Sequence, residues 1–335
     1  MAINVLLTRK FFEGDIGYIK NGLKEGCNII DPGAYTEDDL LKYAEDVDIM
    51  FGPVISKKVC EAAKHLKFIQ IPWNGVDNLN FDLIREIGVK VCNSHSNAAP
   101  VAELAVAMML DAAKKIAYHD RMMRDGEWNR PKPDKSNVVS PFSKKIAGSK
   151  VAIIGFGHIG KLIKQYLSGF CCEFLLADVF FKVDTKVEGA SCFTMDKLAQ
   201  VLEQADFVFL CLPLLDSTLC FFGKEQFDSM KDGAILINTS RGEIVNPGDL
   251  FEALSEKRIG GAAFDTWWNN PKNPFEKAKS SLDYPFEILD NLLMSPQRAG
   301  MVEGELPHLD DAIMNINLTI DGLEPLNVVS VENKF

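Results

Sequence analysis

The stretch VAIIGFGHIGK, residues 151–161, joins a short apolar run to a glycine-rich loop and then to a helical pattern. Val151–Ile154 predicts a buried strand, and Lys161–Leu167 predicts the helix. The pattern Gly-x-Gly-x-x-Gly between a strand and a helix is typical of a loop that binds the pyrophosphate of a dinucleotide. Gly155 would permit the tight turn, Gly157 would let the backbone approach the pyrophosphate, and Gly160 would let the helix pack on the strand.

Asp178 indicates which dinucleotide the loop binds. It ends the predicted strand Glu173–Ala177, 18 positions after Gly160, and the three apolar residues after it include no arginine. A carboxylate there accepts hydrogen bonds from both ribose hydroxyls and repels a 2′-phosphate. We therefore expect NAD as the cofactor, with the N–H groups of His158 and Ile159 at the helix N-terminus directed at its phosphates.

Short apolar runs alternate with amphipathic stretches on both sides of this loop, which is typical of parallel sheets covered by helices on both faces. Before the loop we expect strands at Ile3–Leu7, Asn28–Ile30, Ile49–Phe51, Phe68–Ile71 and Val89–Val91, and helices at Asp38–Glu45, Lys57–Lys67 and Asp82–Ile87. After it we expect strands at Glu173–Ala177, Phe207–Leu212, Ala234–Asn238, Gly261–Phe264 and Asn291–Met294, and helices at Lys197–Glu203 and Pro247–Leu254.

The length of 335 residues exceeds the usual size of one hydrophobic core, so we expect two domains. A linking helix is predicted from about Pro100, and a last helix at Glu305–Ile320. The resulting fold class is α/β, with two doubly wound parallel sheets. We expect residues 1–100 and 297–335 to form a flavodoxin-like domain, and residues 101–296 to form an inserted Rossmann domain that binds NAD.

The composition argues against several classes of partner. With 36 basic and 47 acidic residues the net charge is −11, so a nucleic acid or an anionic membrane surface is not expected. No apolar run approaches the roughly 18 residues of a membrane span, and Arg9 and Lys10 follow the first apolar run where a signal peptide would continue. The eight cysteines are scattered, with no Cys-x-x-Cys pair. We expect reduced thiols, no metal site and a cytoplasmic location.

Several further motifs resemble those of the D-isomer-specific 2-hydroxyacid dehydrogenase family. In chain order the matching stretches are Asn74–Asn78, Val101–Glu103, Gly155–Gly160, Leu212–Leu214 with Thr218, Asn238–Val245, Phe264-Asp265 and Ser295–Gly300. The order of substrate domain, linking helix, NAD domain and C-terminal return is also similar. The resemblance implies hydride transfer between a nicotinamide and C2 of a small 2-hydroxy or 2-oxo acid.

The resemblance implies roles for individual residues. Arg241 is similar to the arginine that binds the substrate carboxylate and oxo group, where a planar guanidinium makes two parallel hydrogen bonds. Trp73, Asn74 and Gly75 fall where the family offers backbone N–H groups to the same carboxylate. Asn97 resembles an asparagine that formate dehydrogenases of this superfamily use on their substrate. The residues similar to the family's cofactor contacts are Leu212, Pro213, Thr218, Thr239, Ser240 and Asp265.

The sequence departs from the family at its proton-transfer pair. Gln297 stands where the family has a histidine, and Asn270 stands where it has a glutamate. A carboxamide can donate a hydrogen bond to a carbonyl oxygen, but it cannot exchange a proton near neutral pH. General acid–base catalysis contributes about 10²–10⁴-fold to a rate, so hydride transfer with water as the proton source would be slow.

Three interpretations stay open. The chain is a working 2-oxo acid reductase with another acid–base group or a relayed water, a crippled or regulatory NAD-binding relative, or a dehydrogenase of a donor such as formate that needs no base. Formate dehydrogenases of the superfamily carry glutamine at the position of Asn270 but keep the histidine. An engineered change at Gln297 is a fourth option.

His95, near Asn97, is a candidate proton relay. The alternative is that His95 is a loop histidine exposed to solvent. The segment Arg130–Pro141 resembles in position the family's dimerisation arm, so a homodimer is expected.

Overall fold

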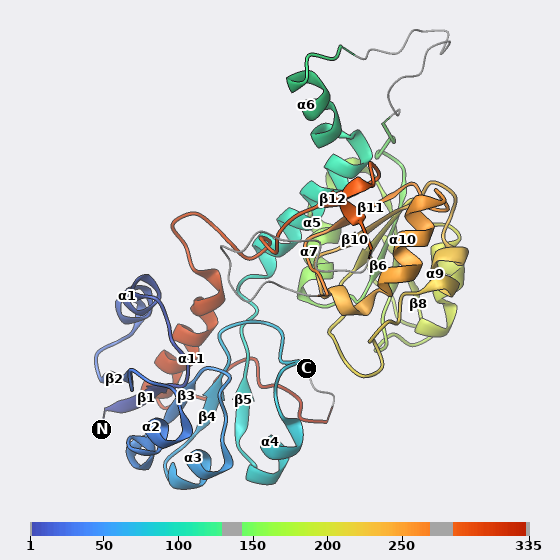
Figure 1. Ribbon diagram of the computed structural model, residues 1–335. Coiled ribbons are helices and arrows are strands. Elements are labelled where there is room, and N and C mark those ends of the chain that lie inside the picture. Colours follow the sequence, from blue (N-terminus) through green and yellow to red (C-terminus); the bar gives the residue numbers. More distant parts are fainter. Residues whose placement is uncertain (1, 129–142, 269–283, 333–335) are drawn as a thin grey trace, which may run out of the picture. The chain divides into compact units, whose positions relative to one another are not determined.

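The computed structural model describes residues 2–128, 143–268 and 284–332, and it divides into two compact units (Figure 1). The first unit is Met1–Ala98 with Gly300–Phe335, and the second is Ala99–Ala299. Two features singled out from the sequence lie outside the described residues, namely Asn270 and the whole arm Arg130–Pro141. Each unit is described by itself below.

The first unit contains a five-stranded sheet in the order β2-β1-β3-β4-β5, and every pairing is parallel. Its strands are β1 (Ile3–Leu7), β2 (Cys27–Ile30), β3 (Ile49–Phe51), β4 (Phe68–Gln70) and β5 (Lys90–Cys92). Its helices are α1 (Glu13–Gly22), α2 (Glu37–Leu41), α3 (Lys57–Ala62), α4 (Phe81–Ile87) and α11 (Asp310–Ile320). This strand order is the flavodoxin-like one.

Helices cover both faces of this sheet because its strands place apolar side chains on both (Figure 1). Leu6 of β1 packs in a core with α2, α3 and α4. Its neighbours Val5 and Leu7 pack in a second core with α1 and α11. The last helix of the chain therefore completes the unit that the first residues begin.

The second unit contains a seven-stranded parallel sheet in the order β12-β11-β10-β9-β6-β7-β8. Its strands are β6 (Lys150–Ile154), β7 (Glu173–Ala177), β8 (Ala190–Phe193), β9 (Phe207–Leu210), β10 (Ile235–Asn238), β11 (Gly261–Phe264) and β12 (Leu292–Met294). Its helices are α5 (Ala98–Lys114), α6 (Ile116–Arg124), α7 (His158–Tyr166), α8 (Leu198–Leu202), α9 (Lys224–Ser229) and α10 (Pro247–Ser255). The strands from β8 to β11 follow the Rossmann order, with β12 added at the edge.

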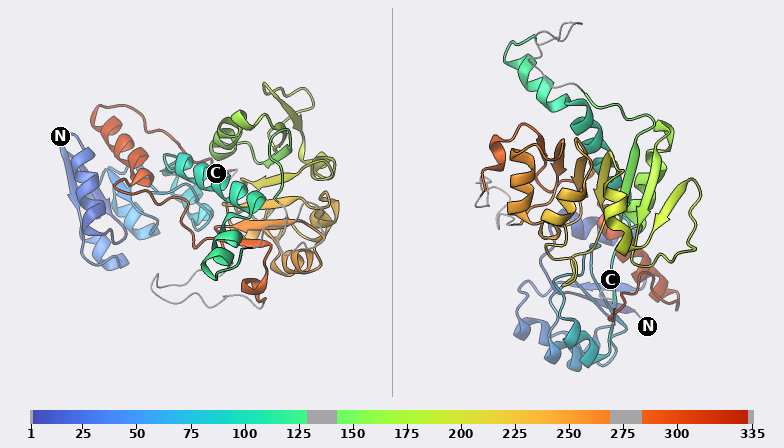
Figure 2. Two further views of the ribbon diagram at one scale, coloured as in Figure 1. Left: turned by 90° about the horizontal axis from the view of Figure 1, so that it is seen from above. Right: turned by 90° about the vertical axis from the view of Figure 1, so that its right-hand side faces the viewer.

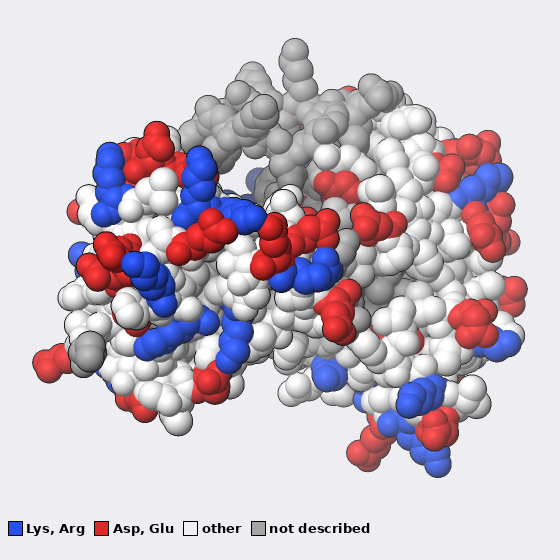
Figure 3. Space-filling model, turned by 90° about the horizontal axis from the view of Figure 1, so that it is seen from below, with Lys and Arg blue, Asp and Glu red and all other residues white. Residues whose placement is uncertain are grey.

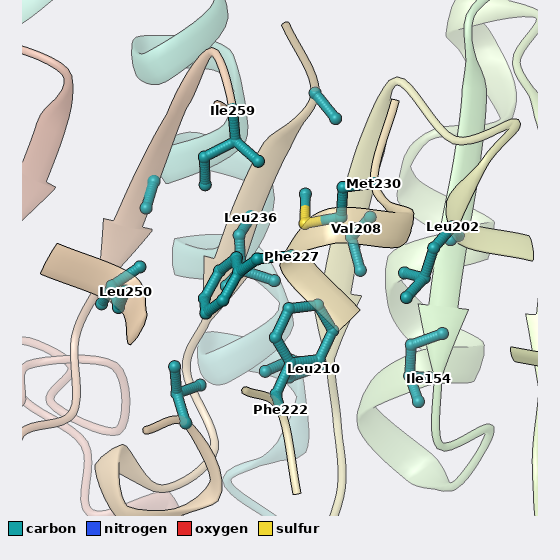
Figure 4. Close-up of a cluster of buried hydrophobic side chains, with 14 of the residues drawn as sticks. Ile154, Leu202, Val208, Leu210, Phe222, Phe227, Met230, Leu236, Leu250 and Ile259 are labelled. Carbon is teal, nitrogen blue, oxygen red and sulfur yellow. The ribbon is translucent and has the colours of Figure 1, made fainter. Parts of the chain in front are cut away.

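The second sheet is also covered on both faces (Figure 2). One core contains α8, α9 and α10, and Figure 4 shows Phe222, Phe227 and Leu236 packed together in it. The opposite core contains α5 and α7. Adjacent residues of β6 alternate between the two cores, as the two-residue period of a strand requires.

The predicted fold class is confirmed in both units, and most strands lie within two residues of their predicted bounds. Three elements were not predicted. Helix α1 contains three glycines and buries only Ile19, and α9 and the edge strand β8 are short, so each gives a weak periodic signal. The last helix begins at Asp310, later than predicted, because Pro307 lies in a preceding 3₁₀ turn.

Among the described residues, no helix is long and apolar enough to cross a membrane, and no cluster of three potential metal ligands is present. On the face shown in Figure 3, basic side chains lie among acidic ones. The expectations about nucleic acid, membrane and metal partners stay predictions.

One ionic cluster ties three strands of the second sheet together at their amino ends. Asp206 precedes β9, and its carboxylate contacts Lys231 Nζ at 2.8 Å and Lys144 Nζ at 3.5 Å. It also accepts a hydrogen bond from the backbone N–H of Lys150, the first residue of β6, at 3.0 Å. Burial opposes ionisation of Asp206. The hydrogen bonds from the Lys231 side chain and the Lys150 backbone, together with the charges of Lys144 and Lys231, outweigh it and lower the pKa of the carboxyl.

We expect Asp206→Asn to lower the free energy of unfolding at pH 7 by about 1–3 kcal/mol. Because the pKa of Asp206 is lower in the folded state, its contribution is complete above the unfolded value of about 4 and disappears as the pH falls through the folded value. Urea unfolding at several pH values measures this difference. The control is Asp228→Asn, which removes an exposed pair with Lys224 and should cost less than about 0.5 kcal/mol. Equal losses in the two variants would contradict the assignment.

Candidate cofactor and substrate site

The glycine-rich loop follows β6, and two of its three glycines are required by close backbone packing. Gly155 has φ +91°, and a Cβ there would lie 2.5 Å from the carbonyl oxygen of Cys211. A Cβ at Gly160 would lie 2.5 Å from the carbonyl oxygen of Gly155. A Cβ at Gly157 would meet nothing within 4 Å. The loop therefore leaves open space at the glycine where the sequence predicts the pyrophosphate, and the residues present fit a dinucleotide.

The position of the loop in the sheet supports the same assignment. The chain passes from β6 to β7 on one side and later returns to β9 on the other, so β6 and β9 mark the topological switch point. Open α/β sheets bind ligands outside the carboxyl ends of their strands at such a point. Helix α7 begins at His158, and the first N–H groups of a helix have no partner within it. They carry the positive end of the helix dipole, which favours a phosphate.

Asp178 follows β7 and lies against the glycine loop. One of its carboxylate oxygens accepts a hydrogen bond from the backbone N–H of Phe156 at 2.6 Å, and the other from the N–H of Phe180 at 2.8 Å. These two backbone N–H groups therefore fix the Asp178 side chain beside the glycine loop. A carboxylate oxygen can accept more than one hydrogen bond, so both oxygens retain capacity for ribose hydroxyls.

The loop after β10 holds Arg241 in a defined position. The buried amide of Asn238 donates to the carbonyl of Arg241 at 2.9 Å, and its oxygen accepts from the N–H and hydroxyl of Ser240 at 3.0 and 2.8 Å. Arg241 is half-buried, and its Nη1 donates to the carbonyl of Ser240 at 2.9 Å. Gly242 packs against the backbone of Trp267, where a Cβ would lie 2.5 Å from the carbonyl carbon. Asn238 is thus a positioning residue that the sequence did not reveal.

Asp265 follows β11 and organises the segment that contains Gln297. Its side chain is buried, and its carboxylate accepts hydrogen bonds from the backbone N–H groups of Arg298 at 2.8 Å and Ala299 at 3.0 Å, and from the hydroxyl of Ser295. The N–H of Gln297 donates to the carbonyl oxygen of Asp265 at 2.9 Å. Asp265 therefore supports this turn. The sequence predicted only a contact of Asp265 with the nicotinamide and did not predict this structural role.

Gln297 itself has the left-handed backbone conformation, with φ +55°, and its side chain is exposed in the second unit. This conformation is uncommon for residues other than glycine and is tolerated best by asparagine, aspartate and histidine. The hydrogen bonds around Asp265 hold the turn in this geometry. The amide of Gln297 is therefore presented to solvent from a fixed backbone.

The other predicted cofactor residues lie at the same sheet edge. Leu212 is buried after β9, Pro213 is exposed, and Thr239 is buried after β10. The Thr218 hydroxyl donates to the carbonyl of Pro213 at 2.6 Å and accepts from the N–H of Leu215 at 2.8 Å. Thr218 thus closes its own loop, and its contact with the cofactor stays a prediction.

In the first unit, the predicted substrate loop follows β4. The carbonyl of Trp73 accepts from the N–H of Ser94 at 3.1 Å, and the carbonyl of Asn74 accepts from the Asn93 amide at 2.8 Å. Within the described residues, the N–H groups of Trp73, Asn74 and Gly75 donate no hydrogen bond. These N–H groups are available as donors, and the predicted contact of this loop with the substrate carboxylate stays a prediction.

Asn97 and His95 follow β5 in the same unit. The Oδ1 atom of Asn97 is buried and has no hydrogen-bond partner among the described residues. The backbone N–H of His95 donates to the Asp311 carboxylate at 2.6 Å. The His95 side chain is half-buried and is therefore not a fully solvent-exposed loop histidine. Whether His95 relays a proton stays a hypothesis.

Comparisons with known proteins agree with this geometry. Residues 106–297 match the family model described as D-isomer specific 2-hydroxyacid dehydrogenase, NAD binding domain. The chain is 31% identical over 247 residues to the glyoxylate reductase of Korarchaeum cryptofilum, covering 73% of this chain and 70% of that one. It is 29% identical over 302 residues to the D-3-phosphoglycerate dehydrogenase of Archaeoglobus fulgidus, covering 89% of this chain and 53% of that one. The chain thus spans only about half the length of that relative.

A solved structure extends the likeness in fold to both units. The D-isomer specific 2-hydroxyacid dehydrogenase of Lactobacillus delbrueckii ssp. bulgaricus, in its NAD-complexed form, has a TM-score of 0.79 and 24% identity, covering 98% of this chain and 100% of that one. The match of residues 106–297 to an NAD-binding family model confirms the predicted cofactor. The chain belongs to the D-isomer specific 2-hydroxyacid dehydrogenase family, with NAD as its cofactor.

Proposed function

We propose that this protein catalyses NAD-dependent hydride transfer at C2 of a small 2-oxo or 2-hydroxy acid. The observation that carries the proposal is the fixed loop Asn238–Arg241, which holds a half-buried guanidinium at the carboxyl edge of the sheet that also carries the glycine loop. A guanidinium in such a position binds a carboxylate through two parallel, charge-assisted hydrogen bonds. The family to which the chain belongs supports the same reaction.

In the proposed cofactor site, the glycine loop and the N-terminus of α7 hold the pyrophosphate, and Asp178 accepts hydrogen bonds from the ribose hydroxyls. Thr239, Ser240 and Asp265 hold the nicotinamide end. When bound, the reduced nicotinamide supplies the hydride that is transferred to C2. The chain's own residues bind, orient and polarise the substrate.

In the proposed substrate site, Arg241 binds the carboxylate and the oxo group. The N–H groups of Trp73–Gly75 bind the same carboxylate, and the amide of Asn97 donates to the substrate. Substrate binding of this kind places the carbonyl carbon for hydride attack, and orientation alone supplies a large part of many enzymatic rate enhancements.

We propose that Gln297 donates a hydrogen bond to the substrate oxo group and does not transfer its proton. Its amide is exposed and its backbone is fixed through Asp265, which supports a polarising role. Water or His95 then supplies the proton. Asn270, the second departure from the family pattern, lies outside the described residues.

Two other functions are consistent with the same residues. A non-catalytic NAD-binding relative would bind the cofactor but turn over no 2-oxo acid. A dehydrogenase that oxidises a formate-like donor would need no base. Such a reaction is compatible with amides at the positions where the family has a histidine and a glutamate. Steady-state oxidation of NADH with a panel of 2-oxo acids, and reduction of NAD by formate, separates these from the main proposal.

We also propose a homodimer in a reducing compartment. Helix α6 has no buried residue in the single chain, and Ile116 and Met123 on it are 57% and 53% exposed. Apolar side chains exposed along one helix favour burial against a partner.

All eight cysteines are free thiols, which supports a cytoplasmic location.

Two matched glycine variants test the cofactor site. Gly157→Ala adds a methyl group where the chain has nothing within 4 Å, so we expect an unchanged free energy of unfolding and an NADH affinity at least about 10-fold lower, because the methyl group displaces the pyrophosphate. Gly160→Ala places the same group against the carbonyl of Gly155 and should destabilise the fold by about 1–3 kcal/mol. NADH fluorescence titration and urea unfolding measure both effects. An unchanged NADH affinity in Gly157→Ala would exclude this loop as the pyrophosphate site.

The variant Gln297→His tests the proton-transfer proposal. Histidine tolerates the left-handed backbone of this position, and a general acid is worth about 10²–10⁴-fold. We expect a rise in kcat of at least 10-fold, with a new titration in the pH profile, while the control Gln297→Asn keeps a slow rate without that titration. A fall in kcat on introducing histidine would show that Gln297 serves a different mechanism.

A further inference from the structure

Arg9 is a half-buried cation in the first unit that no role proposed above uses. It follows β1, and its Cζ atom lies 5.0 Å from the ring centroid of Trp73 and 5.4 Å from that of Phe11. Its Nε donates to the neighbouring carbonyl of Lys10 at 3.1 Å. Among the described residues, no carboxylate lies within ion-pair distance of its guanidinium, unlike many of the surface lysines and arginines. The two terminal nitrogens are left for another anion.

The position of Arg9 is the one where this kind of sheet binds ligands. The chain leaves β1 for β2 on one side and crosses to β3 on the other, so β1 and β3 mark the switch point of the five-stranded sheet. Arg9 follows the carboxyl end of β1 after one residue, Thr8, and Trp73 follows β4 at the same edge. Ligands of open α/β sheets bind outside the carboxyl ends at this point.

Gly52, directly after β3, is part of the same arrangement. It has φ +136°, and a Cβ there would lie 2.6 Å from the Thr8 hydroxyl and 3.1 Å from Cγ of Arg9. Only glycine combines this backbone with so close an approach. The exit of β3 therefore packs directly against the stem of Arg9 and fixes where the guanidinium lies.

Two buried hydroxyls beside these residues lack partners. The Thr8 and Ser94 side chains are completely buried, and within the described residues neither hydroxyl oxygen has a hydrogen-bond partner. Thr8 is adjacent to Arg9, and the N–H of Ser94 donates to the carbonyl of Trp73. A buried polar group without a partner costs stability, and such a group calls for an explanation such as an ordered water or ion beside it.

We propose that Arg9 binds a second anionic group of the substrate, so that this protein prefers 2-oxo acids with a carboxylate or a phosphate at the end remote from C1. This inference rests on the proposed function for its substrate class. The guanidinium fork matches the oxygens of either group. The rings of Trp73 and Phe11 fix its plane and shield it from water, which strengthens a charge-assisted hydrogen bond.

The test compares the wild-type protein with Arg9→Met and with the control Lys10→Met, which removes the adjacent exposed cation. Isothermal titration calorimetry on the NAD-saturated full chain uses two matched pairs of 2-hydroxy acids. D-malate against D-lactate probes a carboxylate, and 3-phospho-D-glycerate against D-glycerate probes a phosphate. Steady-state kinetics then uses the corresponding 2-oxo acids.

We expect the wild-type protein to bind D-malate or 3-phospho-D-glycerate at least 10-fold more tightly than its monoanionic match, and the pair that shows this identifies the group. Arg9→Met should lower the affinity for that doubly substituted acid about 10- to 100-fold, as expected for a lost charge-assisted hydrogen bond, and leave the affinity for the monoanion within about 2-fold. Lys10→Met should change neither by more than about 2-fold.

If the wild-type protein does not prefer the acid with the second anionic group, or if Arg9→Met keeps that preference unchanged, the proposal is overturned. If Arg9→Met does not fold, Arg9→Lys replaces it, since lysine keeps the charge and the apolar stem but not the planar fork, and it should lose most of the preference. If no 2-oxo acid is turned over, the proposed function fails, while the calorimetric preference still decides the role of Arg9.

Discussion

A parallel sheet brings the carboxyl ends of all its strands to one edge, and this constraint determines where the candidate site residues lie in the described part of each unit. In the second unit, Gly155, Asp178, Ser240 and Asp265 each follow a different strand, yet all stand at that edge. In the first unit, Arg9, Gly52 and Trp73 do the same. The ion cluster of Asp206 lies at the opposite edge of the second sheet.

Hydrogen bonds from buried polar side chains give the loops at the site edge their fixed shapes. Asn238 holds the loop of Arg241, and Asp265 holds the turn that contains Gln297. A fixed backbone matters for a residue that acts only by donating a hydrogen bond, because the donor must already lie where charge develops on the oxo group. In the proposed mechanism, a slow rate of hydride transfer would reflect the missing proton transfer and not poor positioning of Gln297.

The sequence predicted those features that depend on local periodicity or on a short motif. The strands of both sheets contain enough β-branched and aromatic residues to be recognised, and the glycine loop is recognisable because three glycines have three separate steric tasks. Helix α1 was missed because its glycines and few buried side chains give it no clear periodicity. Residue roles set by tertiary contacts were also missed. The support that Asp265 gives to Ala299, and the contact of Arg9 with Trp73, join residues far apart in the chain. No local pattern records such contacts.

The most direct test of the central claim follows the hydride itself. The protein is mixed with NADH deuterated at C4 and with a panel of 2-oxo acids, and the products are examined by mass spectrometry and proton NMR. The account predicts a 2-hydroxy acid that carries deuterium at C2, formed by the wild-type chain despite its glutamine at position 297. NADH binding of ordinary affinity without any deuterium in the products would contradict it and would leave the chain as an NAD-binding protein without this chemistry.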